Sequence, residues 1–343
     1  MSIGDKPSVW KYLALSEEEL EQTDLVAINL VVAVGIPRLR DLDIKRYCGV
    51  VDEWTARFAG ELSHMEHAFR RTPDRWKGDL RFFRVGMLAG FLGQVIGARY
   101  NEAQKHAESV RYTDPSDLFL NGVIDTKQGT CGNMAALHVA MCRRMGWPVS
   151  LASVKGHFIS RFDDGEVIHN IEMSSVRQGT FASDPDAFYI EKFDLPARAI
   201  ECGSDLRALT AREMIGIFVA LRARHFWDIG DFDSAEADYC LARALFPRHR
   251  RTYIAASVAI HNRGQHLFDS GEVGYQHLCF AHFGPPQATP EFSPAHGFKA
   301  NLSGIFLGPG SSADQPNLNT NNSVANLGIG ILAHANELGC ANR

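Results

Sequence analysis

The pattern of hydrophobic and polar positions predicts helices over the first hundred residues. A capping-box pattern at residues 16–19 precedes apolar residues at helical spacing, which predict one helix that ends at Gly35. A second helix is predicted to begin after Asp43, and a third, apolar and glycine-containing, covers residues 80–97. We therefore expect residues 1–105 to form a helical N-terminal region.

The pattern changes from residue 117 onward. A turn-rich segment, 125–130, leads to a helix that begins at Cys131 and ends before Gly146. Short strand-like segments follow at residues 149–154, 157–162 and 166–172, with a hairpin turn at Asp163-Asp164-Gly165. A helix followed by antiparallel strands is an α+β layout, so we expect residues 106–205 to form an α+β core.

Helical spacing returns at residues 208–268. Several positions there fit a tetratricopeptide repeat, in which small residues let two antiparallel helices approach and an aromatic side chain fills the groove between them. The matching residues are Gly230, Ala235, Tyr239, Ala242 and Pro247. An ordinary helical hairpin explains the same pattern. We expect residues 206–284 to form a tetratricopeptide-like region that packs against the core or a neighbour, because one repeat cannot bury its own face.

The last part of the chain loses periodicity. Turn-forming and small polar residues dominate residues 285–343, as in Gly308-Pro309-Gly310. We expect this segment to be disordered or poorly packed.

Composition and charge exclude some classes of partner. The chain has 343 residues, of which 45% are hydrophobic and 22% charged, and a formal net charge of −5. These values are ordinary for a globular protein and give no reason to expect nucleic acid or an anionic membrane as a partner. The N-terminus is polar, without the apolar segment of a signal peptide, and no apolar run is long enough to span a bilayer. We expect a cytoplasmic protein.

The sequence motifs also argue against a metal or a cofactor. The seven cysteines are scattered without C-x-x-C pairs, which argues against a disulfide framework or a zinc site. No H-E-x-x-H, phosphate-binding or dinucleotide-binding glycine motif is present. We expect no cofactor and no metal.

The sharpest chemical feature is the segment Gly129-Thr130-Cys131-Gly132. A thiol in the first turn of a helix lies near unpaired N–H groups and the positive end of the helix dipole, and both favour the reactive thiolate. The same N–H groups can stabilise an oxyanion during acyl transfer. A buried helical cysteine such as Cys142 is the ordinary structural alternative.

Two downstream residues make Cys131 a stronger candidate nucleophile. His157 follows a glycine at the start of a predicted strand, and Asn170 lies on the next one. A hairpin that turns between Asp163 and Asp164 places His157 and Asn170 opposite one another. The amide of Asn170 then orients the imidazole, as a third group does in other Cys-His sites.

Residues 117–172 resemble the core of the transglutaminase-like superfamily. The resemblance is closest to bacterial members with a helical N-terminal region and a tetratricopeptide-like C-terminal region. The elements that carry it are Gly129-Thr130-Cys131, Gly156-His157 and Asn170, with Gly146-Trp147-Pro148-Val149 between helix and strand. The resemblance implies a papain/transglutaminase-like core, in which a helix bearing the cysteine packs on antiparallel strands, flanked by helical regions. It also implies a catalytic triad of Cys131, His157 and Asn170.

Some site assignments stay open at this stage. Many members of the superfamily have Asp where Asn170 stands, and Glu172, on the same strand face, is an alternative source of the carboxylate. Gln128 is a candidate oxyanion donor. His138 and His169 are predicted to pack rather than to react. Asp163 and Asp164 are most simply turn residues, although some animal transglutaminases bind calcium and the resemblance leaves that role open.

The expected activity is cysteine-dependent acyl chemistry at an amide, peptide-like carbonyl. A thioester forms on Cys131 with His157 as base, and water or an amine then resolves it. We favour a peptidase or amidase acting on a peptide or protein over a crosslinking transglutaminase. The alternative is a weakly active or inactive scaffold that binds a protein partner through its helical repeat region.

Overall fold

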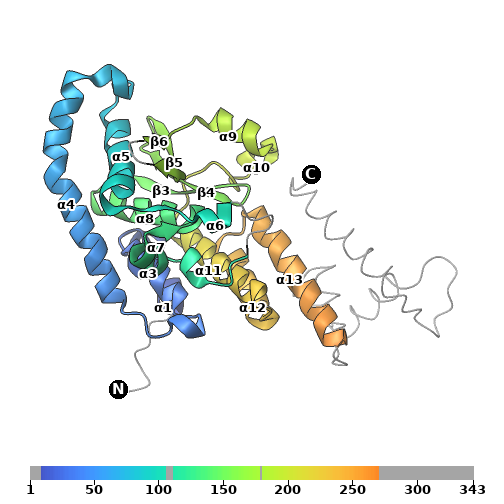
Figure 1. The fold of residues 1–343 in the computed structure, drawn as a ribbon. Coiled ribbons are helices and arrows are strands. Elements are labelled where there is room, and N and C mark those ends of the chain that lie inside the picture. The colour runs from blue at the N-terminus through green and yellow to red at the C-terminus, as the bar shows by residue number, and fades with distance from the viewer. Residues whose placement is uncertain (1–8, 106–110, 178–179, 270–343) are drawn as a thin grey trace, which may run out of the picture.

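The computed structural model describes residues 9–105, 111–177 and 180–269 (Figure 1). At its centre is a four-stranded antiparallel sheet in the order β3-β4-β5-β6. The strands are β3 (Val149–Val154), β4 (His157–Asp163), β5 (Ile168–Arg177) and β6 (Thr180–Ala182). Helices pack around this sheet, which confirms the predicted α+β fold class.

The two faces of the sheet bury different apolar clusters, because successive side chains on a strand point to opposite faces. Leu151 and Phe162 face the main cluster, which includes α8 (Cys131–Arg144). On the same face, Ser160 Oγ of β4 donates a hydrogen bond to the carbonyl oxygen of Ala135 in α8 at 3.2 Å. The opposite face belongs to a smaller cluster, made of Ala152, Val154, Ile159, Tyr189, Leu195 and Leu206.

The smaller cluster is closed by two short helices, α9 (Asp186–Phe193) and α10 (Ala197–Glu201). Tyr189 of α9 is fully buried there, and Ala199 of α10 is also buried. Figure 1 shows both helices beside the sheet, next to β5 and β6. The sheet is therefore covered on both faces.

The N-terminal region is helical, as predicted. It contains α1 (Val9–Leu13), α2 (Glu17–Glu21), α3 (Leu25–Ala33), α4 (Ile44–Arg71), α5 (Leu80–Phe91) and a π-helical turn (Leu92–Ile96), with 3-10 turns at Pro37–Leu39 and Pro73–Trp76. Figure 1 shows α4 running along one side of the molecule. Side chains of α3, α4 and α5 belong to the same apolar cluster as α8.

One N-terminal boundary differs from the prediction. The single helix expected after Ser16 is two helices, α2 and α3. Asp24 begins the second, because its Oδ1 accepts a hydrogen bond from the N–H of Ala27 at 3.0 Å. The capping box at Ser16 and Glu19 is present as predicted.

A small parallel sheet and short helices lead into α8. It pairs β1 (Arg99–Tyr100) with β2 (Gln128–Gly129). Around it lie α6 (Glu102–Lys105), a 3-10 turn (Pro115–Asp117) and α7 (Leu120–Thr126). The segment 125–130, predicted to be turn-rich, therefore contains the end of α7 and β2.

Three long helices follow the sheet: α11 (Ala211–Asp228), α12 (Phe232–Leu245) and α13 (Arg250–Asp269). Gly230, with φ of 84°, joins α11 to α12, and Ala235 and Ala242 are fully buried. The tetratricopeptide-like assignment itself stays a prediction. The tail expected to be disordered, 285–343, lies outside the described residues. Within the described ranges, no helix has the length and apolar character needed to cross a membrane.

Candidate active site

Cys131 is the first residue of α8 and is half-buried. The helix begins there because Thr130 is extended and its N–H donates to Oδ1 of Asn133 at 2.8 Å. The hydroxyl of Thr130 donates to the carbonyl oxygen of Asp117 at 2.7 Å, and Asn133 Nδ2 donates to that of Ser116 at 3.1 Å. These bonds fix the helix start against the preceding 3-10 turn.

Gly129 is required by close contact at this helix start. A Cβ atom on Gly129 would lie 2.4 Å from Asn133 Oδ1 and 2.9 Å from Cγ of Met134. The φ angle of Gly129 is not positive, so a left-handed backbone conformation does not explain the glycine. The missing side chain of Gly129 is what allows the capping amide of Asn133 to approach.

His157 is placed by a tight turn at the start of β4. Lys155 and Gly156 form the two-residue loop between β3 and β4, with φ values of 49° and 86°. Positive φ at both positions is typical of the type I′ turn of tight hairpins. The turn fixes the position of His157 directly after Gly156, as the first residue of the strand.

His157 contacts both a carboxylate and the thiol. Its Nε2 lies 2.5 Å from Oε2 of Glu172 on β5. Although burial lowers the pKa of His157, hydrogen bonds with Cys131 and Glu172, together with their negative charges, raise it to about 10. The raised pKa favours the protonated imidazole at neutral pH, with the Glu172 carboxylate beside its Nε2.

Glu172 is buried, with a side chain only 8% exposed. Its Oε1 accepts hydrogen bonds from the N–H of Ser174 at 2.9 Å and from the Ser174 hydroxyl at 2.7 Å. Although burial raises the pKa of Glu172, its bonds to His157 and Ser174 and the charge of His157 lower it overall. Glu172 is therefore held as a carboxylate, and both of its oxygens have partners.

The predicted pairing of His157 with Asn170 is wrong. The structure pairs Asn170 with Arg161, four positions further along β4. The reason is a longer connection: Asp164 Oδ1 accepts hydrogen bonds from the N–H groups of Glu166 and Val167, so β5 begins at Ile168. Compared with the predicted pairing of β4 and β5, the observed register is shifted by an even number of residues. The side chains of β5 therefore face the side of the sheet that was predicted. Glu172, and not Asn170, lies beside His157.

Asn170 instead belongs to a buried polar network under α9. Its Oδ1 accepts a hydrogen bond from Nη1 of Arg161 at 2.8 Å, and its Nδ2 donates to Oδ1 of Asp186 at 2.7 Å. Arg161, which is 4% exposed, also donates two hydrogen bonds to the Asp186 carboxylate, at 2.7 and 3.1 Å. This network fixes the first residue of α9 to the sheet.

The other end of α9 lies on the imidazole. The ring of Phe193 stacks on His157 with a centroid distance of 5.6 Å and an interplanar angle of 16°. Lys155 Nζ donates to the carbonyl oxygen of Phe193 at 2.8 Å, which ties the helix end to the β3–β4 turn. An aromatic face favours a cation above it, so Phe193 supports the protonated imidazole. Nothing in the sequence pattern indicated this contact.

A tyrosine also lies close to the reacting groups. Burial, together with the nearby Cys131, Asp117 and Glu172, raises the pKa of Tyr100 on β1 to about 12. The Tyr100 hydroxyl is therefore protonated at neutral pH and remains a hydrogen-bond donor. Gln128, the predicted oxyanion donor, lies on β2, which pairs with β1. Gln128 is not among the residues that line the cavity beside Cys131.

The two histidines that were predicted to pack, His138 and His169, have structural contacts. His138 is fully buried in α8, where its Nε2 lies 3.0 Å from the carbonyl oxygen of Val85 and burial lowers its pKa to about 4. His169 Nε2 lies 2.9 Å from Oδ2 of Asp79, the N-cap residue of α5. Among the described residues, no hydrogen bond joins either of these histidines to Cys131.

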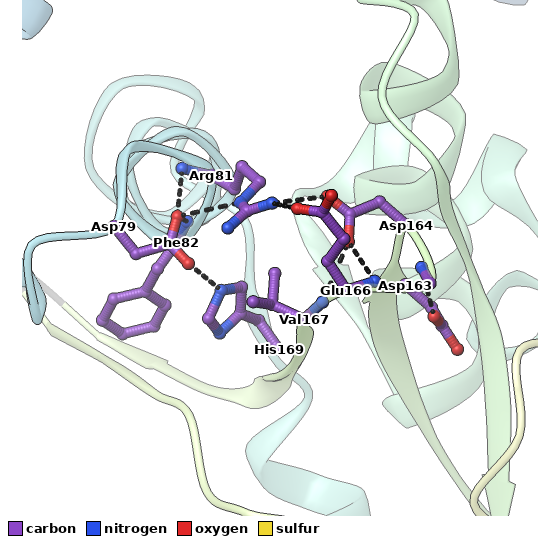
Figure 2. A network of polar contacts seen from close by, with 9 residues as sticks. Asp79, Arg81, Phe82, Asp163, Asp164, Glu166, Val167 and His169 are labelled. Carbon is purple, nitrogen blue, oxygen red and sulfur yellow. Dashed lines mark hydrogen bonds and ion pairs between the residues drawn. The ribbon is translucent and has the colours of Figure 1, made fainter.

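Figure 2 shows the polar network that joins the β4–β5 turn to α5. Arg81 Nη1 donates to Oδ2 of Asp164 and to Oε2 of Glu166, each at 2.9 Å. Asp163 Oδ1 accepts a hydrogen bond from the N–H of Gly165 at 3.1 Å. The side chains of Asp163 and Asp164 thus stabilise the β4–β5 turn. Within the described ranges, no group of three or more His, Cys, Asp or Glu side chains is arranged to hold a metal ion.

A cavity of about 770 Å³ opens beside Cys131. Cys131 and Gly132 line it, together with residues of the β3–β4 turn and of α11, α12 and α13. The thiol is therefore accessible to a ligand, in contrast to Cys142, which is fully buried in the same helix.

Comparison with known proteins gives one family match. Residues 57–195 match the family model of the transglutaminase-like superfamily. This range contains Cys131, His157 and Glu172. No curated protein and no solved structure gave a match.

Proposed function

Because residues 57–195 form a transglutaminase-like superfamily domain, we propose that the protein is a cysteine enzyme that transfers or hydrolyses the acyl group of an amide substrate through a thioester on Cys131. One observation carries this proposal. His157 contacts Cys131 on one side and, at 2.5 Å, the buried carboxylate of Glu172 on the other. This is the arrangement of nucleophile, acid–base group and orienting group that acyl transfer requires.

The first half of the reaction uses the protonated form of His157. The Cys131 thiolate attacks the amide carbonyl carbon, and the carbonyl oxygen takes the negative charge. N–H groups in the first turn of α8 have no partner within the helix and stabilise this oxyanion. His157 then gives its proton to the leaving amine, the C–N bond breaks, and a thioester remains on Cys131.

The second half uses the neutral imidazole. His157 takes a proton from water or from an amine, which attacks the thioester carbonyl. The C–S bond breaks, the Cys131 thiolate returns, and His157 is again its protonated partner. Glu172 does not touch the substrate. It is a positioning residue, because its carboxylate binds Nε2 of His157 and so holds the ring in place.

We favour hydrolysis of a peptide-like bond over crosslinking. Crosslinking transglutaminases of animals can depend on calcium, and the acidic turn considered for such a site is already engaged. Both carboxylate oxygens of Asp164 accept hydrogen bonds, from the N–H groups of Glu166 and Val167 and from Arg81.

Alkylation and acylation of the thiol test the proposal. Iodoacetamide is expected to alkylate Cys131 at neutral pH faster than the exposed Cys202, and Cys142 not at all in the folded protein, as measured by peptide mass spectrometry. With 4-nitrophenyl acetate, a burst of about one equivalent of nitrophenolate per chain is expected, which Cys131→Ala abolishes. Adding a primary amine then separates hydrolysis from amine transfer by the product formed.

Loss of the histidine provides the control. His157→Ala is expected to lower the alkylation rate of Cys131 and leave that of Cys202 unchanged. If Cys131 reacts no faster than Cys202 and His157→Ala has no effect, the enzyme assignment is wrong, and the domain acts as a scaffold for a protein partner.

A further inference from the structure

The cavity beside Cys131 touches the thiol but not the imidazole. Cys131 and Gly132 of α8 line it, and His157 is not among the described residues that do so. In the proposed reaction the leaving amine lies at His157, because it receives its proton there. The acyl group, which stays on the sulfur, is therefore the part of the substrate that this cavity can receive.

A large part of the cavity wall is apolar. Its aromatic and aliphatic side chains come from separate parts of the chain and include Tyr112, Phe158, Leu221, Trp227, Tyr239 and Ile254. The cavity volume of about 770 Å³ lies within the range of about 300–1,000 Å³ that is usual for ligand pockets. A wall of this kind binds an apolar group by removing its surface from water.

The apolar wall begins directly beside the nucleophile. A Cβ atom on Gly132, the residue after Cys131, would lie 3.3 Å from Cδ1 of Leu221 and 3.8 Å from Cδ2 of Phe158. These two side chains therefore lie against the first turn of α8. The first atoms of an acyl group on the sulfur have apolar side chains within reach.

Another part of the wall belongs to a packed apolar cluster between α11, α12 and α13. The cluster contains Ala223, Tyr239, Ala256 and Ala259, with Ala220, Trp227 and Ala255 packed against it. Ala220 and Ala255 line the cavity with single methyl groups. Small side chains at these two positions leave space between the helices for the rest of an acyl group.

Charged side chains of the lining have partners within the protein. Arg224 Nε donates a hydrogen bond to Oδ2 of Asp228 at 2.8 Å. Lys155 Nζ donates to the carbonyl oxygen of Phe193 at 2.8 Å, and Nη1 of Arg251 donates to that of Lys155. Because these contacts engage the charges within the protein, we expect the apolar side chains to decide which acyl group binds best.

We propose that the substrate carries a large apolar group on the acyl side of the amide bond, and that Leu221 of α11 and Ala255 of α13 determine this specificity. The inference rests on the proposed acyl chemistry at Cys131 and names the substrate class of that site, an aliphatic or aromatic acyl donor. Leu221 contacts the acyl group near the sulfur, and Ala255 leaves room for the rest of it. The specificity therefore comes from helices beyond residue 195, where the family match ends.

A series of 4-nitrophenyl esters tests the proposal in the full chain. Acetate, butyrate and hexanoate share the leaving group and differ in the length of the acyl chain. The rate constant of acylation is taken from the nitrophenolate burst, after subtraction of the reaction of Cys131→Ala. The chain-length quotient is the hexanoate rate divided by the acetate rate, and then by the same ratio for N-acetylcysteine. We expect this quotient to be on the order of 10², about threefold for each methylene group buried.

Two variants change the wall in different ways. Ala255→Trp fills the cavity, and Leu221→Gln places an amide in the apolar wall at similar volume. Each is expected to lower the chain-length quotient by about tenfold or more. The quotient compares rate constants on one protein, so it does not depend on the fraction of active molecules or on the reactivity of the thiol.

Ala237→Trp is the matched control for the added ring. Ala237 lies on α12, is exposed and is not among the residues that line the cavity. Ala237→Trp is expected to leave the chain-length quotient unchanged. If it lowers the quotient as much as Ala255→Trp does, the effect is not local and the inference is wrong.

The outcomes separate this inference from the proposed function. If Cys131 gives a burst but the quotient of the wild type is about one, the inference is wrong and the proposed function stands, whether or not the variants fold. If the wild-type quotient is high but neither Ala255→Trp nor Leu221→Gln lowers it, the inference is also wrong. If no ester gives a burst that depends on Cys131, the proposed function fails and the inference fails with it.

Discussion

Oε2 of Glu172 lies 2.5 Å from Nε2 of His157 across two neighbouring strands. The other oxygen of the same carboxylate accepts two hydrogen bonds from Ser174. Bonds to both oxygens therefore fix the orientation of the Glu172 carboxylate. A charged partner stabilises the imidazolium in a way that an amide cannot. The carboxylate beside His157 is therefore Glu172, two positions beyond the residue expected from the sequence.

Glu172→Gln tests the role of this charge. Removing the carboxylate is expected to lower the pKa of His157 from about 10, because one of the groups that raise it is lost. The acylation rate of Cys131 is expected to fall about 10²-fold or more, as when the acidic residue of a triad becomes an amide. NMR titration of the His157 ring and stopped-flow acylation measure the two effects.

Asn170→Ala is the control for that experiment. Asn170 binds Arg161 and Asp186 and not His157, so its loss is expected to lower stability and leave the pKa of His157 unchanged. If Asn170→Ala lowers this pKa as much as Glu172→Gln does, Asn170 is the orienting residue after all.

The stability of the protein is expected to depend on pH through His157. Its pKa is about 10 in the folded protein and 6.5 as the reference value, so protonated His157 stabilises the fold fully below pH 6.5. This contribution is lost as the pH rises through about 10. The free energy of unfolding in urea, compared between wild type and His157→Gln, is therefore expected to differ most near pH 6 and least above about pH 10. A difference that does not change over this range contradicts the assignment.

Phe193 is expected to support the imidazolium by its ring face. Phe193→Leu removes the stacked ring while keeping an apolar side chain, and a buried cation–π contact contributes about 1–2 kcal/mol. The pKa of His157 is thus expected to fall by about one unit and the alkylation of Cys131 to slow by up to about tenfold. Phe193→Tyr is expected to restore both. If Leu and Tyr behave alike, the ring contributes only packing.

Gly129→Ala is expected to destabilise the protein by about 1–3 kcal/mol, the usual cost of overpacking. The added methyl would lie 2.4 Å from Asn133 Oδ1, which caps α8. Gly60→Ala in α4 is the comparison, because nothing lies within 4 Å of its Cβ position and a helical glycine costs about 1 kcal/mol relative to alanine. Urea unfolding of both variants is expected to give changes of opposite sign.

Local chemistry made several features predictable from the sequence. Thr130 and Asn133 cap the helix that begins at Cys131, and a lysine–glycine pair makes the tight turn before His157. Both signals lie within a few residues of the feature that they set. The face of β5 was also predictable, because strand residues alternate and an even shift in register keeps the face.

The features that were not predictable depend on distant contacts or on loop length. The β4–β5 turn is centred two residues later than its Asp-Asp-Gly sequence indicated, since Asp164 caps two further N–H groups. Asn170 is drawn to Arg161 and Asp186, and the second of these lies on a helix that begins sixteen residues later. Phe193 reaches His157 only because α9 folds across the sheet.

The two hairpin connections of the sheet differ in how much change they permit during evolution. The Lys155–Gly156 connection has no spare residue, and a shift of one residue in the pairing of β4 would turn the imidazole to the opposite side of the sheet. The connection from Asp163 to Ile168 is longer and carries no reacting group. Variation in loop length among relatives should therefore concentrate at the second connection, while the first keeps a constant number of residues.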